Sequence, residues 1–436
     1  MVVGAGIAGL YAAMMLEAEG LKVVVVEARD RVGGRLLTLD DVPGRPEAGG
    51  LQIGQLYGRT MDAAMRAGVA LEASAAPTSR GFAYHVGGAL VAAGAWTSAP
   101  ANRLAGDERA VLPSHLLTHY LARMPALPDD EAWATPDAAR HDIALTRALR
   151  NLGASDEAIR LIGVNANSNA IERLSTLYLL RSAAVLRIGA GPTQVVIGGS
   201  ARLPEAMARA LKGDVRLGSP VVSLDETPGQ VAVGLADGSR IVARQAICTL
   251  PFGVLRDIDL GSAMLPLSLA RAILLMPYTR ITQLHLTASA PFWQDDGLPK
   301  YLWSDDRRLG RVFDYGGGRD GVHNLVVWLT GASAEAVDTL PAEVAGAQAI
   351  AAYESARPAA RGGLRFHRRV SWGTDPFARG AYHHWGPGEM SRYAAPPPVP
   401  GARLHLAGEH LARRASGIEG ACESGADAAF AAIDRA

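Results

Sequence analysis

The order of apolar and polar positions at the start of the chain predicts a strand, a helix and a second strand. Residues 1–3 form a short apolar run, and small or apolar residues then recur at helical spacing from Ala8 to Leu16. The run KVVVVE, residues 22–27, is typical of a parallel strand that is buried on both faces. With so few residues before the first glycine, the sequence leaves open whether the natural chain begins upstream.

A second clear period lies in TRITQLHLTASAPFW, residues 279–293. Side chains alternate between the two faces of a strand, so Leu284, Leu286 and Ala288 share an apolar face. The opposite face is partly polar because it carries Gln283 and His285. We therefore expect a strand whose polar face lies either against water or inside a reaction chamber.

The rest of the pattern predicts mostly helices and loops from about residue 56 to 195, followed by more strands. The stretch IERLSTLYLLRSA is an amphipathic helix, and its Tyr178 and Arg181 face either a cavity or the solvent. Pro396 to Pro400 predicts a stiff linker. We also expect a glycine loop and helix from residue 198, a strand pair from 230, an apolar strand at NLVVWLTG, and a final strand and long helix.

Composition favours a small-molecule enzyme. The chain has 436 residues, which predicts two or three domains. Forty-three basic residues balance 43 acidic ones. The chain therefore has neither the net positive charge that attracts nucleic acid nor a polybasic segment for an anionic membrane. No secretion signal or apolar run of spanning length occurs, and we expect a soluble, cytoplasmic protein without membrane contact.

The two cysteines, Cys248 and Cys422, exclude a disulfide framework and have no metal-ligand spacing. Both lie in apolar surroundings, so buried thiols in a reducing compartment are expected. The neighbouring histidines His383 and His384 also lack a second ligand at metal spacing. We predict no metal site.

A glycine fingerprint follows the first predicted strand. Gly4, Gly6 and Gly9 fill the G-x-G-x-x-G positions, which permit a tight turn, a close approach of backbone to a pyrophosphate, and close helix–sheet packing. Glu27 ends the second strand, where a carboxylate accepts hydrogen bonds from ribose hydroxyls and repels a 2′-phosphate. The pattern predicts a dinucleotide site that disfavours NADP.

Two further blocks near the N-terminus distinguish FAD from NAD by resemblance. EARDRVGGR resembles the second fingerprint of FAD proteins of the glutathione-reductase type, and EAGGLQIG, residues 47–54, resembles the next block of the flavin amine oxidases. The resemblance implies that these blocks bring backbone to the flavin and an arginine to its phosphates. The cofactor-binding residues implied are Ala28, Arg29, Gly34, Arg35, Gly50, Leu51 and Gln52.

Blocks across the rest of the chain resemble the flavin-containing monoamine and polyamine oxidases in the order of that family. The family implies Val222 at the adenine, Trp372 packed on the flavin, and Gly408 and Glu409 after the last strand of the FAD domain. It also implies that the helix beginning at Gly417 and Ile418 points its N-terminus at the flavin edge that becomes negative on reduction.

The resemblance implies an α/β fold with a discontinuous Rossmann-like FAD-binding domain. That domain takes residues 1–55, 196–255 and 400–436, and residues 56–195 and 256–399 form a substrate-binding domain of mixed sheet plus helices. The family removes a hydride equivalent from the carbon beside an amine and passes electrons to O2, which gives an imine and hydrogen peroxide.

Three departures from the family pattern concern the substrate site. Gln283 stands where many members have a lysine that assists flavin reoxidation. Tyr382 matches the first ring of the aromatic cage around the substrate amine, but Gly417 stands in place of the second. Gln52 replaces the arginine with which L-amino acid oxidases bind the substrate carboxylate.

Several residues could compensate for these departures. Trp385, His383 or Tyr178 could fill the space beside Gly417. In place of Gln52, a carboxylate could be bound by Arg181, Arg311 or Arg319. Ala381 stands where covalent members have a cysteine, so FAD is expected to be noncovalent.

The sequence therefore predicts oxidation of a bulky amine, such as a secondary amine or amide in natural-product biosynthesis. Gln283, Tyr382 and Trp385 are its expected catalytic residues, and Tyr178, His383, Gly417 and Gln52 its expected substrate-binding residues. The alternatives are a simple amine or L-amino acid oxidase, a flavin dehydrogenase or desaturase acting on C–C bonds, and a flavin-dependent rearrangement or noncatalytic FAD-binding module. A homodimer is also expected.

Overall fold

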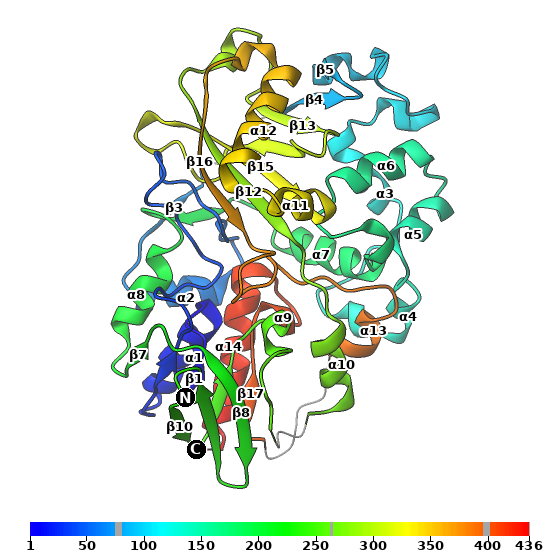
Figure 1. The fold of residues 1–436 in the computed structure, drawn as a ribbon. Helices are drawn as coiled ribbons and strands as arrows, with labels where there is room; N and C mark the ends of the chain where they lie inside the picture. The colour runs from blue at the N-terminus through cyan, green and yellow to red at the C-terminus, as the bar shows by residue number, and fades with distance from the viewer. Residues whose placement is uncertain (75–80, 262–264, 396–401, 436) are drawn as a thin grey trace.

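The chain folds around two large sheets that lie at opposite ends of the molecule (Figure 1). The structure is a computed structural model, and it describes residues 1–74, 81–261, 265–395 and 402–435. The proline linker predicted at 396–400 lies outside these residues. Both termini lie at the end that holds the smaller of the two sheets (Figure 1).

The smaller sheet is parallel and joins strands from distant parts of the sequence. Its strands are apolar and fully buried at the centre, as the early VV and KVVVVE runs predict. The order of the sheet is β17 (Leu404–Leu406), β11 (Ala246–Cys248), β1 (Val2–Val3), β2 (Val25–Val26) and β7 (Val215–Arg216).

Helices cover this sheet, and α1 and α14 lie side by side (Figure 1). Close packing depends on a missing side chain, because a Cβ on Gly425 of α14 would collide with the Ala8 carbonyl oxygen. Glu419 of α14 accepts hydrogen bonds from the backbone N–H groups of Arg59 and Thr60 and so caps α2. The helices of this layer are α1 (Ile7–Ala18), α2 (Gly58–Arg66), α8 (Arg202–Ala210) and α14 (Gly417–Ile433).

The larger sheet has seven strands of mixed direction. Leu284, Leu286 and Ala288 of β12 enter an apolar core, whereas Gln283 and His285 lie on the other face, as the alternation predicts. The order is β16 (Leu364–Ser371), β12 (Ile281–Ala288), β15 (His323–Thr330), β14 (Arg311–Phe313), β13 (Tyr301–Ser304), β4 (Phe82–Val86) and β5 (Ala89–Val91).

The remaining elements surround these two sheets. They include an antiparallel sheet of β10 (Arg240–Ala243), β9 (Gln230–Leu235) and β8 (Val221–Thr227), and a pair formed by β3 (Leu71–Ala73) and β6 (Gln194–Val196). The other helices are α3 (Leu116–Leu121), α4 (Pro136–Ala139), α5 (Leu145–Asn151), α6 (Asp156–Val164), α7 (Thr176–Ile188), α9 (Phe252–Leu255), α10 (Leu267–Leu275), α11 (Gly331–Asp338), α12 (Ala342–Ala356) and α13 (Met390–Tyr393).

The predicted α/β class with a Rossmann-like unit is confirmed. The strand predicted at NLVVWLTG is β15, and the predicted final strand and long helix are β17 and α14. The exact domain boundaries stay a prediction. Within the described residues, no helix has the length and apolar character needed to cross a membrane.

Candidate active site

One long cavity, of about 660 Å³, runs from the first glycine turn to the larger sheet. Segments from both ends of the chain and from its middle line it. Of the predicted cofactor-binding residues, all except Gly9 lie on its wall: Gly4, Gly6, Glu27, Ala28, Arg29, Gly34, Arg35, Gly50, Leu51, Gln52, Val222, Trp372, Gly408, Glu409, Gly417 and Ile418.

The glycine fingerprint has the geometry of a phosphate cradle. Gly4 has a positive φ of 101°, which permits the turn into α1. A Cβ on Gly6 would meet nothing within 4 Å, so the open space beside it is available to a diphosphate at the helix N-terminus. Gly9 lies off the wall because it serves helix packing: a Cβ there would collide with the Gly4 carbonyl oxygen.

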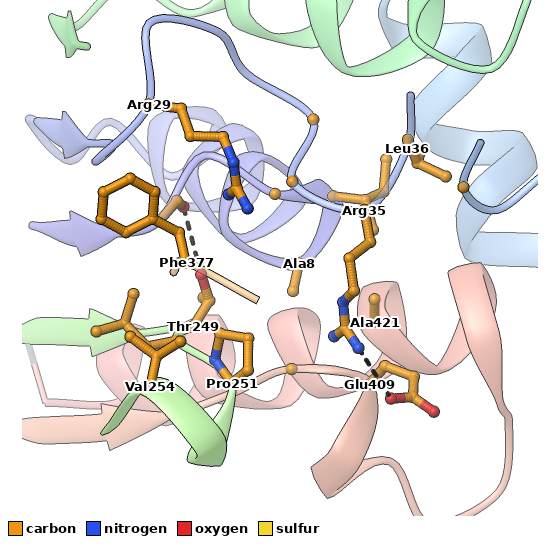
Figure 2. A pocket seen from close by; sticks show the side chains of 18 of the residues that line it. Ala8, Arg29, Arg35, Leu36, Thr249, Pro251, Val254, Phe377, Glu409 and Ala421 are labelled. Carbon is orange, nitrogen blue, oxygen red and sulfur yellow. Dashed lines mark hydrogen bonds and ion pairs between the residues drawn. The ribbon is translucent and has the colours of Figure 1, made fainter. Parts of the chain in front are cut away.

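The ribose end of the cavity contains a fixed carboxylate. Glu27 is 5% exposed and accepts hydrogen bonds from the backbone N–H groups of Ala5 at 2.8 Å and Arg29 at 3.0 Å. The Arg29 side chain forms an ion pair with Asp375 at 2.5 Å. Phe377, from the same segment as Asp375, lies next to Arg29 at the wall (Figure 2).

Contacts between charged residues connect the middle of the cavity wall to residues packed behind it. Arg35 donates to the Ala381 carbonyl oxygen at 2.7 Å and approaches Glu409 to 4.0 Å (Figure 2). Glu409 also pairs with Nδ1 of His383 at 3.0 Å. Burial opposes ionisation of Glu409, but His383 and Arg35 outweigh it and lower the pKa of Glu409 to about 2. This carboxylate is therefore ionised at neutral pH.

The EAGG block forms a wall of backbone. Glu47 is fully buried and accepts hydrogen bonds from the Ser200 hydroxyl at 2.5 Å and from Thr38. A Cβ on Gly50 would press against Leu36 and Ile418, so only glycine keeps this wall thin. Nε1 of Trp372 donates to the Ala48 carbonyl oxygen at 2.7 Å and holds the indole at the wall.

The N-terminus of α14 meets the cavity at Gly417, as predicted. Two buried residues fix the preceding loop: Glu423 accepts from the N–H groups of Arg413, Arg414 and Ala415, and Arg181 donates to the Ala412 and Ala415 carbonyl oxygens. The helix end thus presents its N–H groups and positive dipole end to the cavity, where they stabilise negative charge.

Tyr382 lines the cavity, as expected for a cage ring. Tyr315 and Trp328, which the sequence analysis did not assign, also line it, and their ring centroids are 5.3 Å apart. The Tyr315 hydroxyl donates to the Gly49 carbonyl oxygen at 2.7 Å. Burial raises the pKa of both Tyr315 and Tyr382, so their hydroxyls stay neutral.

Gln283 does not line the cavity, which differs from the predicted chamber position. Its side chain is fully buried, with Nε2 donating to the Ala48 carbonyl oxygen at 3.2 Å and Oε1 paired with Nε2 of His285 at 3.0 Å. The loop that carries Ala48 covers the polar face of β12. Gln283 therefore lies behind the wall and shares the Ala48 carbonyl with Trp372.

Tyr178, His383 and Trp385 also lie behind the wall, and their predicted contact with substrate is not supported. The Tyr178 hydroxyl donates to the His383 carbonyl oxygen at 2.9 Å, and the His383 ring is held by Glu409. Trp385 is 2% exposed and packs in an apolar core. His384 is buried too, next to Thr279, so neither histidine faces the cavity.

Two of the three arginines considered for a carboxylate are already engaged. Arg181 holds the loop before α14, and Arg319 donates to Glu47 at 3.3 Å and to the Arg45 carbonyl oxygen. Gln52 lies on the cavity wall and is exposed. Arg311 donates to Oδ1 of Asn167 and does not lie on the cavity wall.

Neither cysteine is placed to form a covalent bond with the flavin. Ala381 lines the cavity at the position of the linking cysteine. Cys248 and Cys422 are both free and buried, and neither lines the cavity. Burial raises the pKa of the Cys248 thiol to about 12, which keeps it protonated. The cradle, the carboxylate and the helix end fit FAD held without a covalent bond.

Sequence reasoning missed other wall residues because their types carry no motif. Tyr315 lies in a glycine-rich loop, and Trp328 lies in a strand that was predicted only as apolar. Phe377 follows the Trp372 block and would have required knowledge of the chain path. The one available signal was aromatic content next to glycines, which is too common to assign a site.

Two family profiles match the chain. The profile described as flavin containing amine oxidoreductase matches residues 126–433, well over half of the chain. A profile described as NAD(P)-binding Rossmann-like domain matches residues 2–61.

Curated relatives align over nearly the whole chain. The flavin-dependent L-tryptophan oxidase RebO of Lentzea aerocolonigenes is 25% identical over 99% of this chain and 97% of its own length. Amine oxidase (flavin-containing) B of Homo sapiens is 25% identical over 98% of this chain and 85% of its own.

Solved structures share the fold. Cyclohexylamine oxidase from Brevibacterium oxydans has a TM-score of 0.81 at 23% identity, and the comparison covers 100% of this chain and 98% of that one. Wild-type putrescine oxidase bound to putrescine has a TM-score of 0.78, also at 23% identity and with the same coverage. At this level of identity the likeness concerns the fold alone.

Proposed function

Because this chain belongs to the family of flavin-containing amine oxidoreductases, we propose that it oxidises the carbon–nitrogen bond of a bulky amine. The enzyme is a flavin-dependent amine oxidoreductase with FAD as its cofactor. When bound, FAD takes up a hydride equivalent from the carbon beside the nitrogen, and O2 is the proposed final acceptor. The products are then an iminium and hydrogen peroxide.

The observation that carries the proposal is the open space at Gly417. This residue lines the cavity, and a Cβ built on it would meet nothing within 4 Å. An aromatic side chain at this position would occupy roughly 150 to 250 Å² of surface. Its absence leaves the part of the cavity beside Gly417 free for substrate bulk.

The residues that line the cavity favour binding of a neutral amine, and the proposed reaction needs no strong base. Tyr382, Tyr315 and Trp328 offer ring faces, and burial keeps both tyrosines neutral. The role we assign to these residues is orientation of the α-carbon together with exclusion of water. Glu409 is held by His383 and Arg35, so it is not available as a base.

The substrates that suit this space are secondary amines or amides of the kind formed in natural-product biosynthesis, where an internal nucleophile captures the iminium. We place the enzyme in the cytoplasm, in keeping with its two free, buried cysteines. We also propose that the enzyme forms a homodimer. A simple amine or amino acid oxidase is the alternative that keeps the same chemistry.

The test is anaerobic flavin reduction by matched amines. Butylamine, cyclohexylamine and tetrahydroisoquinoline form a series of rising bulk, and we expect the bulkiest to reduce the flavin fastest. Gly417→Tyr should slow flavin reduction by tetrahydroisoquinoline roughly tenfold or more, equivalent to about 1.4 kcal/mol. It should leave the rate of flavin reduction by butylamine unchanged. Gly417→Ala is the matched control, since it shares the strain of the positive φ of 58° without the bulk. Equal effects on all amines would contradict the proposed role of this space.

A second candidate is a flavin dehydrogenase or desaturase that acts on C–C bonds, because Gln283 brings no positive charge to the flavin region. Enzyme reduced with dithionite and mixed with oxygenated buffer distinguishes the two. Fast return of oxidised FAD with peroxide supports the oxidase. Slow return, together with no reduction by any amine, would favour the dehydrogenase.

A further inference from the structure

We propose that His383 is a positioning residue for the cofactor: its imidazole holds the carboxylate of Glu409 at the cavity wall, where that carboxylate accepts hydrogen bonds from hydroxyl groups of FAD. His383 does not line the cavity, so it acts on FAD through Glu409. This role goes beyond the proposed function, because it concerns how the chain holds its cofactor and depends on no property of the amine.

The Glu409 carboxylate keeps acceptor capacity at the cavity wall. Among the described residues, its hydrogen-bond donor is Nδ1 of His383, which lies 3.0 Å from one carboxylate oxygen and 3.1 Å from the other. Arg35 lies 4.0 Å from Glu409 and donates to the Ala381 carbonyl oxygen instead (Figure 2). Because a carboxylate has about four lone-pair positions, one N–H group fixes Glu409 and leaves positions for the donors of a ligand.

The surrounding protein fixes His383 in its turn. Its backbone pairs with Tyr278 in an antiparallel bridge, and its carbonyl oxygen accepts a hydrogen bond from the Tyr178 hydroxyl at 2.9 Å. The Tyr178 ring also meets the imidazole edge to face, with ring centroids 5.6 Å apart. His383 is 5% exposed. A side chain held by packing and by hydrogen bonds can keep the residue in front of it in one orientation.

The neighbouring histidine shows that burial alone does not produce this arrangement. His384 is buried as well, at 1% exposure, but its Nδ1 lies 3.1 Å from the Thr279 hydroxyl. Among the described residues, its ring has no carboxylate partner. The chain thus offers two adjacent buried imidazoles, of which one holds a carboxylate of the cavity wall.

The charges also support this role. Burial opposes ionisation of Glu409, but His383 and Arg35 outweigh it, and the pKa of Glu409 falls to about 2. Without His383 the effect of burial would gain weight, and the pKa of Glu409 would rise. A protonated carboxyl group has lost part of its acceptor capacity. FAD affinity would then be lost as the pH falls through the raised pKa.

The groups around the His383–Glu409 pair keep one charge state between pH 6 and pH 8. Burial raises the pKa of Tyr178 and Tyr278, so both hydroxyls stay neutral. Burial is also the largest cause that lowers the pKa of His384 to about 4 and of His410 to about 3. Arginine stays protonated throughout this range, so a pH effect there reports on the pair itself. The titratable and charged groups that face the pair are Arg35, Tyr178, Arg181, Tyr278, His384 and His410.

The test is dilution of the FAD-loaded enzyme at pH 8 and at pH 6, with the release of FAD followed by its fluorescence. At pH 8, His383→Leu should bind FAD roughly tenfold more weakly than the unaltered enzyme. At pH 6 it should lose a further factor of roughly three or more, beyond any change in the unaltered enzyme. His383→Asn, whose amide nitrogen can donate in place of Nδ1, should recover most of the affinity at pH 8. His384→Leu is the matched control and should behave as the unaltered enzyme does.

Unchanged FAD affinity in His383→Leu would overturn the assigned role, as would equal losses in His383→Leu and His384→Leu. If His383→Leu does not fold, His383→Asn and His383→Gln decide the question. The amide nitrogen of glutamine lies one bond farther from the backbone than Nδ1, so the asparagine variant should bind FAD more tightly, and equal affinities would contradict the role. The proposed function fails separately, when no amine of the bulk series reduces the flavin, because no amine enters the dilution experiment.

Discussion

At the scale of single residues, Gly6 and Gly9 belong to one fingerprint but have different roles. Gly6 faces open cavity and has an ordinary φ of −73°, so its missing side chain serves the ligand. Gly9 faces the Gly4 carbonyl and the Val2 side chain, so its missing side chain serves the fold. Glycine is therefore needed at position 6 for ligand binding and at position 9 for packing.

We predict that Gly6→Ala leaves the stability of the FAD-free protein within about 0.5 kcal/mol of the original, because the methyl group points into space. It should weaken FAD binding roughly tenfold or more. Gly9→Ala should instead destabilise the FAD-free protein by about 1 to 3 kcal/mol, because it overpacks the helix–sheet contact. Urea unfolding of the FAD-free protein and FAD titration measure the two effects, and a common loss in both variants would refute the distinction.

Gln283 gives a second prediction at this scale. A lysine at this position would put a positive charge beside Ala48, whose backbone lines the cavity, and oxygen reduction builds negative charge there. Gln283→Lys should therefore speed reoxidation of the reduced flavin more than it speeds reduction by substrate. Stopped-flow mixing with oxygen checks this, with Gln283→Met as the uncharged control. No change in either step would leave Gln283 with a structural role only.

The predicted residues that lie on the cavity wall are mostly those whose expected task involves the backbone. Glycines, Glu27 and the Trp372 block could be placed from motif and resemblance, since such positions tolerate few alternatives. Trp385, His383 and Tyr178 lie off this wall, and residue type and spacing do not tell which face of a segment meets the cavity. Arg311 could be named as one of three arginines, but its contact with Asn167 and its place off the cavity wall required the structure.

At the scale of elements, the cavity end of α14 depends on a loop with no regular structure of its own. The carboxylate of Glu423, the seventh residue of the helix, accepts hydrogen bonds from the N–H groups of Arg413, Arg414 and Ala415 at 2.7 to 3.0 Å. Arg181 holds the carbonyl side of the same loop. The helix thus determines the path of the chain that leads into it.

We predict that Glu423→Ala destabilises the protein by about 3 kcal/mol, because three N–H groups lose their common acceptor. Glu423→Gln retains one acceptor oxygen, so it should lose about half as much. The flavin absorption spectrum should also change in both variants, since Gly417 and Ile418 line the cavity. Urea unfolding and visible absorption measure this, and unchanged stability would show that Arg181 alone holds the loop.

The long elements could be predicted from the sequence, and their contacts could not. Periodicity indicated β12, β15 and α14 because each has an apolar face of sufficient length. The loop of Ala48, which covers the polar face of β12, decides that Gln283 is buried. That contact joins residues 235 positions apart, and no local pattern encodes it.

At the scale of the whole molecule, buried neutral histidines link stability to pH. Burial is the largest cause that lowers the pKa of His285 to about 3, of His384 to about 4 and of His410 to about 3. In the unfolded chain these groups bind protons near pH 6.5. Below that pH the unfolded state binds more protons than the folded state, so stability falls as pH falls toward the folded pKa values.

We predict that the urea midpoint of the FAD-loaded enzyme decreases from pH 7 to pH 5. His410 has no hydrogen-bond partner for either ring nitrogen among the described residues and packs against Phe252. His410→Leu should therefore reduce the pH dependence by up to about 1.4 kcal/mol per pH unit. His115→Leu, at an exposed position, should leave the slope unchanged. An unaltered slope in His410→Leu would mean that His410 is protonated in the folded enzyme.

The parallel sheet of the cofactor end has its strands in the order β17, β11, β1, β2 and β7, which places the last strand of the chain beside strands made much earlier. Residues 404–406 join the sheet, and Glu409, Gly417 and Ile418 then complete the cavity wall. A ribosome delivers these residues after every other part of the wall except Ala421. Flavin loading must therefore wait until this segment has been made, and a cell short of FAD would accumulate chains that await their cofactor.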